Sequence, residues 1–232
     1  MKGFILAGGE GTRLYPITLE TPKPLVTVHN VPVLSYLVDL YLNNDIDDIR
    51  INIQQKHSQN FEKWKKEYFP NQNIKFIIEP ELSGTFTPLM KTELQWFSET
   101  IVVSNGDELK ELNLREMIDW HKEQGGLATI GLIKVENAEA YGSVQLEKNK
   151  IVKFGEKSET PLSSYVSSGL YIMNPGIKEY FPKNAKFSML EKDLFPILAQ
   201  EGKLFGYKWQ GKWQDVGTLE RWEQAIKTWK NK

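Results

Sequence analysis

The stretch FILAGGEGTRL, residues 4–14, decides the fold that we expect for this chain. It begins with the apolar run Phe4 to Ala7, which is typical of a strand buried on both faces of a parallel sheet. Glycines follow directly, at Gly8, Gly9 and Gly11. Because glycine has no Cβ, the backbone N–H groups of such a loop can approach an anion closely. The stretch predicts a central strand followed by an anion-binding loop, although a tight turn alone would use the same glycines.

Helix and strand patterns alternate after this stretch. Strands that alternate with helices are typical of a doubly wound sheet, so we expect an α/β fold with a mostly parallel, Rossmann-like sheet. The apolar spacing predicts helices over residues 33–41, 61–68, 89–97 and 114–123, and strands at 49–53, 74–78 and 100–104.

The second half of the chain is richer in strand patterns. Ser188 and Glu191 have the spacing of a capping box at the start of a helix. No linker or repeat interrupts the sequence, so we expect one domain over residues 1–232, with halves at 1–125 and 126–232. Strands are predicted at 127–134, 141–146, 150–154 and 165–173, and helices at 175–180, after Phe187 and at 218–229.

The composition excludes several classes of protein. The 29 Lys and Arg residues nearly balance 30 Asp and Glu, so no basic excess predicts a nucleic-acid partner. The absence of cysteine excludes disulfides, thiolate metal sites and cysteine nucleophiles. No apolar run is long enough to span a membrane or to form a signal-peptide core. We therefore expect a globular, cytoplasmic protein without a membrane partner.

Two basic residues near the glycines favour a phosphate ligand. Arg13 offers a planar set of donors that suits phosphate oxygens. Lys23 lies between two prolines, Pro22 and Pro24, which restrict the backbone around it. The loop is neither a dinucleotide fingerprint, since Leu14 occupies the place of a third glycine, nor a Walker A loop. Two cations and a set of backbone amides predict a polyphosphate site.

Residues 8–18 and 22–24 resemble the signature of the sugar-1-phosphate nucleotidyltransferases, and the resemblance extends over essentially the whole chain. Each short motif is weak alone, but their order is highly specific. Within this family, the chain resembles the short guanylyltransferases that act on mannose 1-phosphate or manno-heptose 1-phosphate. The further matching segments are residues 105–107, similar to the family's metal-binding turn, residues 141–142, 154–157 and 167–171, similar to its sugar pocket, and residues 213–218, similar to the segment with its second metal ligand.

The resemblance implies a nucleotidyltransferase that makes an NDP-sugar and pyrophosphate from an NTP and a sugar 1-phosphate. A sugar-phosphate oxygen attacks the α-phosphorus in line with the leaving pyrophosphate, and no side-chain nucleophile is needed. Positioning and electrostatic stabilisation should dominate the catalysis. Residues 1–125 would form the nucleotide-binding half and residues 126–232 the sugar-binding half. Relatives are often homo-oligomers.

The resemblance also implies a role for individual residues. Arg13, Lys23 and Asp107 would act on the reacting phosphates. Asp107 and Asp215 would hold Mg²⁺, a hard cation that prefers carboxylate and phosphate oxygens. The NTP would contact Leu6, Ala7, Gly8, Gly9, Gly11, Thr12, Arg13, Glu79, Gly84 and Thr85, and the sugar phosphate would contact Asn105, Gly142, Glu156, Lys157, Ser168 and Gly169.

Each of these acidic residues also has a simpler interpretation. Asp107 has the place of a turn aspartate after Asn-Gly, and Asp215 that of a loop acid before a helix cap. Glu156 has the pattern of a surface strand residue, and Glu79 that of a solvent-exposed strand end. Glu191 is interpreted here as the capping-box partner only.

Glu79 suggests which nucleotide is used. Relatives that use uridine or thymidine triphosphates often have Gln at this place before Gly84. Guanine presents two adjacent donors, which match the two acceptor oxygens of a carboxylate, whereas uracil would place a carbonyl oxygen against it. We therefore expect GTP as the donor, with mannose 1-phosphate or a manno-heptose 1-phosphate as the acceptor.

Other functions remain open at this point. One alternative is uridylyl or thymidylyl transfer to glucose 1-phosphate or another sugar 1-phosphate. A second is a nucleotide-sensing subunit without catalysis, and a third is transfer to phosphocholine. Two departures from the family also bear on the site: Phe86 makes the loop after Gly84 bulkier, and Glu108 adds a carboxylate beside Asp107.

Overall fold

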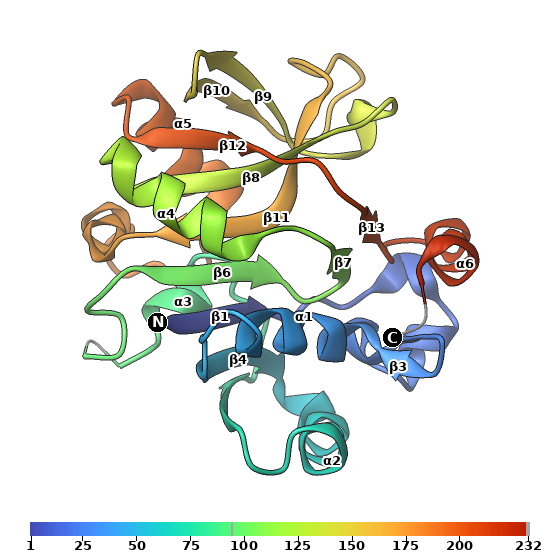
Figure 1. Cartoon of the computed structure of the whole chain (residues 1–232). Coiled ribbons are helices and arrows are strands. Elements are labelled where there is room, and N and C mark those ends of the chain that lie inside the picture. Colours follow the sequence, from blue (N-terminus) through green and yellow to red (C-terminus); the bar gives the residue numbers. More distant parts are fainter. Residues whose placement is uncertain (94, 231–232) are drawn as a thin grey trace. The chain divides into compact units, whose positions relative to one another are not determined.

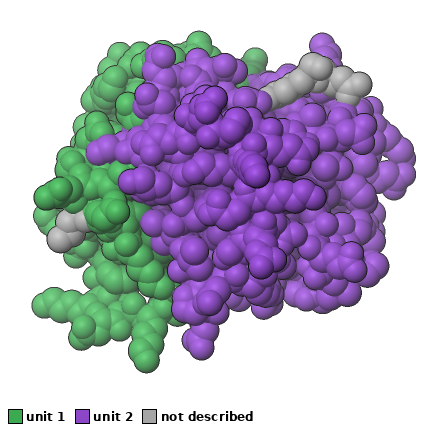
Figure 2. Space-filling model, turned by 90° about the horizontal axis from the view of Figure 1, so that it is seen from below, with its two compact units in different colours: residues 1, 83–104, 112–210 green, residues 2–82, 105–111, 211–232 purple. Residues whose placement is uncertain are grey.

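The structure, a computed structural model, describes residues 1–93 and 95–230. The chain forms two compact units, and each of them is discontinuous in sequence (Figure 2). Unit 1 consists of residues 1, 83–104 and 112–210, and unit 2 of residues 2–82, 105–111 and 211–232.

Unit 2 contains three parallel strands that confirm the predicted start of the fold (Figure 1). Their order is β5–β4–β1, so the first strand pairs with the second and the second with the third. Phe4, Ile5 and Ile51 are fully buried, as the apolar runs predict for strands covered on both faces. The elements are β1 (Lys2–Leu6), α1 (Val33–Leu42), β4 (Asp48–Gln54), α2 (Ser58–Tyr68) and β5 (Asn73–Glu79).

Short elements complete unit 2. The last helix, α6 (Leu219–Thr228), begins at the predicted cap, since the Thr218 side chain accepts a hydrogen bond from the Arg221 N–H. Ala225 and Trp229 pack it into a core that includes Val28, whereas Leu219 and Ile226 remain exposed. The remaining elements are β2 (Thr27–Val28), β3 (Val31–Pro32), β7 (Glu108–Lys110), β13 (Trp213–Asp215) and the 3-10 helices η1 (Thr12–Leu14), η2 (Ile17–Leu19), η3 (Lys23–Leu25) and η4 (Gln55–His57).

Unit 1 is built on a mixed sheet, as the strand-rich second half predicts. Its strand order is β6–β11–β8–β12–β10–β9, and β11 runs antiparallel to both of its main neighbours. The pairing of β11 with β8 shifts register between Ser167 and Tyr171. The strands are β6 (Ile101–Asn105, its last residue in unit 2), β8 (Ala128–Lys134), β9 (Ser143–Glu147), β10 (Lys150–Gly155), β11 (Tyr165–Met173) and β12 (Leu204–Lys208).

The helix predicted over residues 89–97 is wrong for most of its length. It ends at Met90, because the Thr92 hydroxyl donates to the Leu89 carbonyl and competes with the helical hydrogen bonds. Trp96 and Phe97 are buried nonetheless, and Leu94 lies outside the described residues. The helical elements of unit 1 are α3 (Thr87–Met90), α4 (Leu114–Gln124), η5 (Ala138–Ala140), η6 (Pro175–Tyr180), the π-helical turn η7 (Leu190–Leu194) and α5 (Phe195–Gln200).

The capping box predicted at Ser188 is also wrong. The Ser188 hydroxyl donates to Asp193 over 2.8 Å, and the Met189 N–H donates to the same carboxylate over 2.7 Å. The turn that starts here is a π-helix, which is wider than an α-helix and lets an acid five residues away take the place of Glu191. Glu191 is thereby available for a contact elsewhere in unit 1.

Candidate active site

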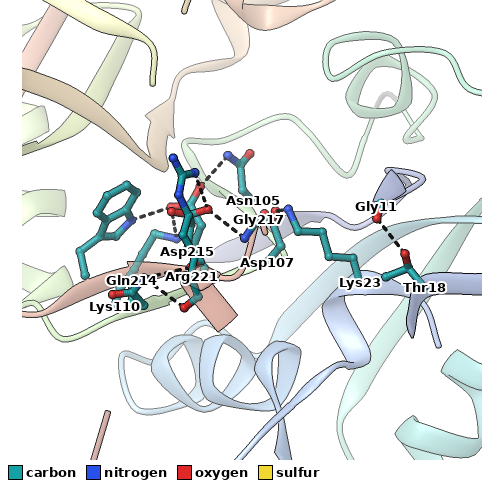
Figure 3. A network of polar contacts seen from close by, with 12 residues as sticks. Gly11, Thr18, Lys23, Asn105, Asp107, Lys110, Gln214, Asp215, Gly217 and Arg221 are labelled. Carbon is teal, nitrogen blue, oxygen red and sulfur yellow. Dashed lines mark hydrogen bonds and ion pairs between the residues drawn. The ribbon is translucent and has the colours of Figure 1, made fainter. Parts of the chain in front are cut away.

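The glycine loop of unit 2 starts where β1 ends and is held by polar side chains of the neighbouring strand. Asn52 Oδ1 accepts from the Ala7 N–H over 3.0 Å, and the Gln54 amide donates to the Gly8 carbonyl over 2.7 Å. Thr18 donates to the Gly11 carbonyl over 2.7 Å (Figure 3). These bonds fix the loop at the carboxyl edge of parallel strands, where open α/β sheets bind ligands.

Glu79 lies beside this loop, at the carboxyl end of β5. Its side chain is 1% exposed, and Oε2 accepts from the Asn52 amide over 2.7 Å. A Cβ at position 8 would lie 2.6 Å from the Asn52 amide nitrogen and 3.0 Å from the same Glu79 oxygen, so glycine leaves room for this pair. The interpretation of Glu79 as a solvent-exposed strand end is therefore wrong.

Lys23 and Asp107 form an ion pair in unit 2 (Figure 3). Pro24 and Leu25 are buried beside Lys23, so its short helix is anchored as the prolines predict. Burial alone would raise the pKa of Asp107, but the charge and hydrogen bond of Lys23 outweigh it, with help from the charge of Lys110, and hold that pKa below its ordinary value. Asp107 is therefore an ionised carboxylate next to a fixed ammonium group.

Glu108 lies next to Asp107 but has different contacts. It accepts from the Asn105 amide over 2.9 Å and from the Trp213 indole N–H over 2.7 Å. The fully buried Lys110 ammonium lies 3.2 Å from its Oε2. Burial and the neighbouring Asp107 raise the pKa of Glu108, although Lys110 opposes this shift. The Asn105 side chain is thus tied to Glu108, and its contact with a sugar phosphate stays a prediction.

Asp215 ends strand β13 and is buried, with 7% of the residue exposed. Its Oδ1 accepts from the Gly217 N–H over 2.9 Å and from Arg221 Nη1 over 3.1 Å. The following residue, Val216, donates its N–H to the Asp107 carbonyl over 3.1 Å. The two predicted metal ligands therefore belong to adjoining backbone segments of unit 2 (Figure 3).

Arg13 reaches the same region. Its Nη2 lies 3.6 Å from the point that a Cβ of Gly217 would occupy, and Arg221 Nη1 lies at the same distance from that point. The structure thus brings together the predicted residues Arg13, Lys23, Asp107 and Asp215, and it adds Arg221. We call these five residues the ion-pair cluster.

The donor set of the ion-pair cluster fits a hard divalent cation. Asp107 and Asp215 offer carboxylate oxygens, which Mg²⁺ prefers together with phosphate oxygens and water. Among the described residues, no group of three or more His, Asp and Glu side chains gathers as a metal site. Asp107 and Asp215 would therefore hold Mg²⁺ with its remaining ligands supplied by substrate and water.

Four predicted residues meet with Glu191 in unit 1: Thr85, Gly142, Glu156 and Lys157. We call these five residues the carboxylate cluster. A Cβ at Gly142 would lie 3.6 Å from Glu156 Oε2, so these two residues are neighbours. Glu191 interacts electrostatically with Glu156 and Lys157. The rings of Phe154 and Phe195 pack 5.3 Å apart, which holds β10 against the start of α5.

Glu191 is a member of this cluster that the sequence did not indicate. Thr85 Oγ1 donates to Glu191 Oε2 over 2.6 Å and accepts from the Leu190 N–H over 2.9 Å. Burial raises the pKa of Glu191, and the charge of Glu156 adds to this, while Thr85 and Lys157 oppose it. Thr85 lies 106 positions away in the sequence, so local spacing could not reveal this pair.

Gly84 brings Thr85 to this position. Its φ is +89°, and a Cβ there would lie 2.2 Å from the Ser188 carbonyl oxygen, so no other residue fits without displacement. The bulky Phe86 that follows is fully buried and packs edge-on against Phe181, with ring centroids 5.2 Å apart. Its bulk therefore belongs to the core of unit 1.

Ser168 and Gly169 lie at the register shift of β11. The Ser168 hydroxyl is buried, donates to the Gly131 carbonyl over 2.8 Å and lies 3.3 Å from the Trp209 indole N–H, which donates to it. The Gly169 N–H donates to Ser167 Oγ over 3.2 Å. The Ser168 side chain thus holds the sheet together, and contact of this segment with a sugar stays a prediction.

The predicted nucleotide-binding residues do not all belong to one unit. Leu6 to Arg13 and Glu79 are part of unit 2, whereas Gly84 and Thr85 are part of unit 1. The residues of the site in unit 2 that the sequence did not predict are Asn52, Gln54 and Arg221. For Asn52 and Gln54 the available signal was the alternation of polar residues with isoleucines along β4.

Residues 2–232 match the nucleotidyl transferase family, and the chain therefore belongs to that family. It is 36% identical over 225 residues to the mannose-1-phosphate guanyltransferase of Saccharomyces cerevisiae. It is 35% identical over 223 residues to the mannose-1-phosphate guanylyltransferase catalytic subunit beta of Xenopus tropicalis. These alignments cover 94% of this chain, and the chain spans 61% of the length of each relative.

A solved structure supports the same assignment of fold. It is that of a candidate glucose-1-phosphate thymidylyltransferase from Bacillus anthracis in complex with sucrose, with a TM-score of 0.89 and 27% sequence identity. The alignment covers 98% of this chain and 94% of that one. None of the helices in the described part of the chain is long and apolar enough to cross a membrane.

Proposed function

We propose that this protein transfers a guanylyl group from GTP to mannose 1-phosphate or a manno-heptose 1-phosphate, forming a GDP-sugar and pyrophosphate. The observation that supports this most is the ion-pair cluster, where Arg13, Lys23 and two carboxylates meet beside the glycine loop. The names of the yeast and frog relatives agree with it. The cluster suits a polyphosphate with a divalent cation better than it suits any neutral ligand.

In the proposed reaction, a phosphate oxygen of the sugar 1-phosphate forms a bond to the α-phosphorus of GTP. The bond between the α-phosphorus and the bridging oxygen to the β-phosphate breaks, and pyrophosphate leaves with that electron pair. No side chain becomes covalently modified, so the residues act by position and charge.

The residues of unit 2 have distinct tasks in this reaction. Arg13 binds the β- and γ-phosphates and stabilises the charge that develops on the leaving pyrophosphate. Lys23, fixed by its ion pair with Asp107, neutralises the reacting phosphates. Mg²⁺, held by Asp107 and Asp215, would supply charge neutralisation on the phosphate oxygens when bound.

Glu79 distinguishes guanine from pyrimidines in this proposal. Asn52 holds its Oε2, yet a carboxylate oxygen has two lone pairs and can accept a second hydrogen bond. The carboxylate can therefore accept from guanine N1–H and the 2-amino group together. A uracil carbonyl would meet the same carboxylate with repulsion.

Glu156 and Lys157 of the carboxylate cluster bind the acceptor, whereas Thr85 of the same cluster stays a predicted contact of the NTP. Glu156 accepts hydrogen bonds from sugar hydroxyls, and Lys157 pairs with the sugar phosphate. A Cβ at Gly142 would lie 2.8 Å from the Phe154 ring, so glycine lets the backbone pass close to this ring and to Glu156. The backbone at Gly142 and Gly169 contacts the sugar in this proposal. The charge and hydrogen-bonding capacity of Glu156 and Lys157 favour a hydroxyl-rich acceptor over a quaternary ammonium such as choline, which would require an aromatic cage.

A second candidate is thymidylyl transfer to glucose 1-phosphate, which the name of the Bacillus anthracis neighbour favours. A pyrophosphate-release assay over GTP, ATP, UTP and dTTP, each with mannose, manno-heptose and glucose 1-phosphates, separates the two. We expect the fastest release with GTP. Faster release of pyrophosphate with dTTP or UTP would favour the second candidate. If no combination of NTP and sugar 1-phosphate releases pyrophosphate, the result would favour a nucleotide-sensing subunit without catalysis.

A further inference from the structure

Arg221 is a basic residue of the ion-pair cluster to which the proposed reaction assigns no task. It lies in the first turn of α6, and its Nη1 donates to Asp215 Oδ1 over 3.1 Å (Figure 3). Its side chain is 23% exposed and that of Asp215 is 10% exposed, so the pair is largely shielded from water. An ion pair in such surroundings is less screened than one on the surface.

The start of α6 does not depend on this side chain. Thr218 caps the helix by accepting a hydrogen bond from the Arg221 N–H, which is a backbone group and would be present in any variant. Val216, Ala225 and Trp229 pack α6 into the core of unit 2. The contact of the guanidinium with Asp215 is therefore separate from the contacts that start the helix and pack it.

Two donors converge on one oxygen of Asp215. Oδ1 accepts from both the Gly217 N–H and Arg221 Nη1. Carboxylates that ligate a metal are themselves hydrogen-bonded, and those outer partners set their orientation. A carboxylate held at one oxygen by two donors keeps a defined orientation toward a cation.

Gly217 makes this arrangement possible. A Cβ at this position would lie 2.5 Å from Asp215 Oδ1 and would push the carboxylate out of place. The absence of a side chain also leaves space for Arg13 and Arg221, whose nearest nitrogens both lie 3.6 Å from that point. Two guanidinium groups beside one carboxylate leave an excess of positive charge, which suits an anionic ligand there.

We propose that Arg221 is a positioning residue for Asp215, which fixes the orientation of that carboxylate for a divalent cation. This inference rests on the proposed function only in assigning Asp215 as a ligand of Mg²⁺. Arg221 itself acts through Asp215 and needs no contact with the substrate.

The test compares Arg221→Gln and Arg221→Lys with the wild-type protein and with Lys227→Gln. Lys227 is a matched control, because it is an exposed cation on the same helix, paired with Glu223 over 2.6 Å. Mn²⁺ alone is titrated into each protein, and the free ion is followed by its paramagnetic resonance signal. Thermal unfolding of each variant confirms that it is folded.

We expect Arg221→Gln to weaken Mn²⁺ binding by about 10- to 100-fold, as removal of an outer partner of a metal ligand does. Arg221→Lys should lose less, because it keeps the charge, and Lys227→Gln should bind like the wild type. In the pyrophosphate-release assay, Arg221→Gln should raise the Mg²⁺ concentration for half-maximal rate and leave the KM for the sugar phosphate unchanged.

Unchanged Mn²⁺ binding in Arg221→Gln would overturn the inference, and so would tighter binding, which would mean that Arg221 only competes with the cation for Asp215. Absence of Mn²⁺ binding in the wild type would overturn it as well. If Arg221→Gln does not fold, equal Mn²⁺ binding by Arg221→Lys and the wild type is the overturning result. A wild type that binds Mn²⁺ but releases no pyrophosphate would contradict the proposed function and leave this inference standing.

Discussion

The ion-pair cluster of unit 2 and the carboxylate cluster of unit 1 are built in different ways. In the first, two carboxylates each have a basic partner: Asp107 pairs with Lys23, and Asp215 pairs with Arg221. In the second, the buried Glu191 has the neutral hydroxyl of Thr85 as its hydrogen-bond donor. The pKa of Asp107 is accordingly lowered, whereas that of Glu191 is raised, chiefly by burial.

This difference agrees with the two ligands that we propose. In the ion-pair cluster, basic side chains hold the carboxylates that bind a polyphosphate and a divalent cation. Loss of one partner of such a pair leaves the charge of the other uncompensated. In the carboxylate cluster, neutral hydroxyl groups and backbone amides hold the side chains that bind the sugar. Replacing one hydrogen-bond acceptor by another there costs less free energy. Substitutions in the ion-pair cluster should therefore have larger effects than substitutions in the carboxylate cluster.

The largest effect is expected at the two candidate metal ligands. Asp107→Asn and Asp215→Asn should each lower kcat by about three orders of magnitude, because a metal ion supplies several kcal/mol of charge stabilisation. The double variant should be scarcely slower than either single one, since ligands of one ion act as a unit. Initial rates of pyrophosphate release measure all three, and losses that multiply would show that the two residues do not share an ion.

A structural substitution in unit 1 comes next. Gly84→Ala should lower the free energy of unfolding by about 2–4 kcal/mol, because it combines a positive φ with a clash against the Ser188 carbonyl. Gly125→Ala is the matched control: its φ is +68° and nothing lies within 4 Å of its Cβ. It should cost only about 1–2 kcal/mol. Urea unfolding measures both, and equal losses would mean that the Ser188 contact is relieved.

Glu79 gives the next largest effect, on the choice of nucleotide. Glu79→Gln should cost about 1–3 kcal/mol in kcat/KM for GTP and partly restore activity with UTP, because one acceptor becomes a donor. Glu81→Gln, an exposed neighbour, should change neither value. If Glu79→Gln keeps the wild-type ratio of kcat/KM for GTP to kcat/KM for UTP, Glu79 does not recognise the base.

The smallest effect is expected at Glu191. Its raised pKa means that the folded protein binds a proton there more tightly than the unfolded chain, so stability falls as pH rises from its ordinary value of 4.5 through the raised value. Glu191→Gln removes that loss, and its amide oxygen can still accept from Thr85. The variant should therefore be more stable than the wild type at pH 8, and this advantage should shrink or vanish at pH 5. Urea unfolding at both pH values measures this, and a variant that loses stability at pH 8 would show that the charge itself is needed.

Short-range patterns predicted the parts of the fold that depend on them. The apolar run at residues 4–7 predicted β1, because burial on both faces requires such residues. The isoleucines predicted β4 and β5, although β4 alternates isoleucine with polar residues and Ile78 of β5 is 51% exposed. The same reasoning failed for residues 89–97, where the Thr92 hydroxyl bond decides the outcome, and at Glu191, where a distant threonine does.

The candidate site shows the same limit. The glycines, Lys23 and Asp107 were predicted from motifs, and the structure pairs Lys23 with Asp107 across 84 positions. Asn52 and Arg221 were not predicted, since each acts through a contact with a residue from another segment, and no motif contains both partners.

The central claim is most directly tested by ³¹P NMR of the protein with GTP, mannose 1-phosphate and Mg²⁺. The account predicts that the three GTP signals decline while pyrophosphate and the two coupled phosphorus signals of a GDP-sugar appear in equal amounts. The Asp107→Asn variant should leave the spectrum nearly unchanged over the same time. Release of orthophosphate without a GDP-sugar, or GTP and mannose 1-phosphate that persist together with the wild-type protein, would contradict guanylyl transfer to this acceptor.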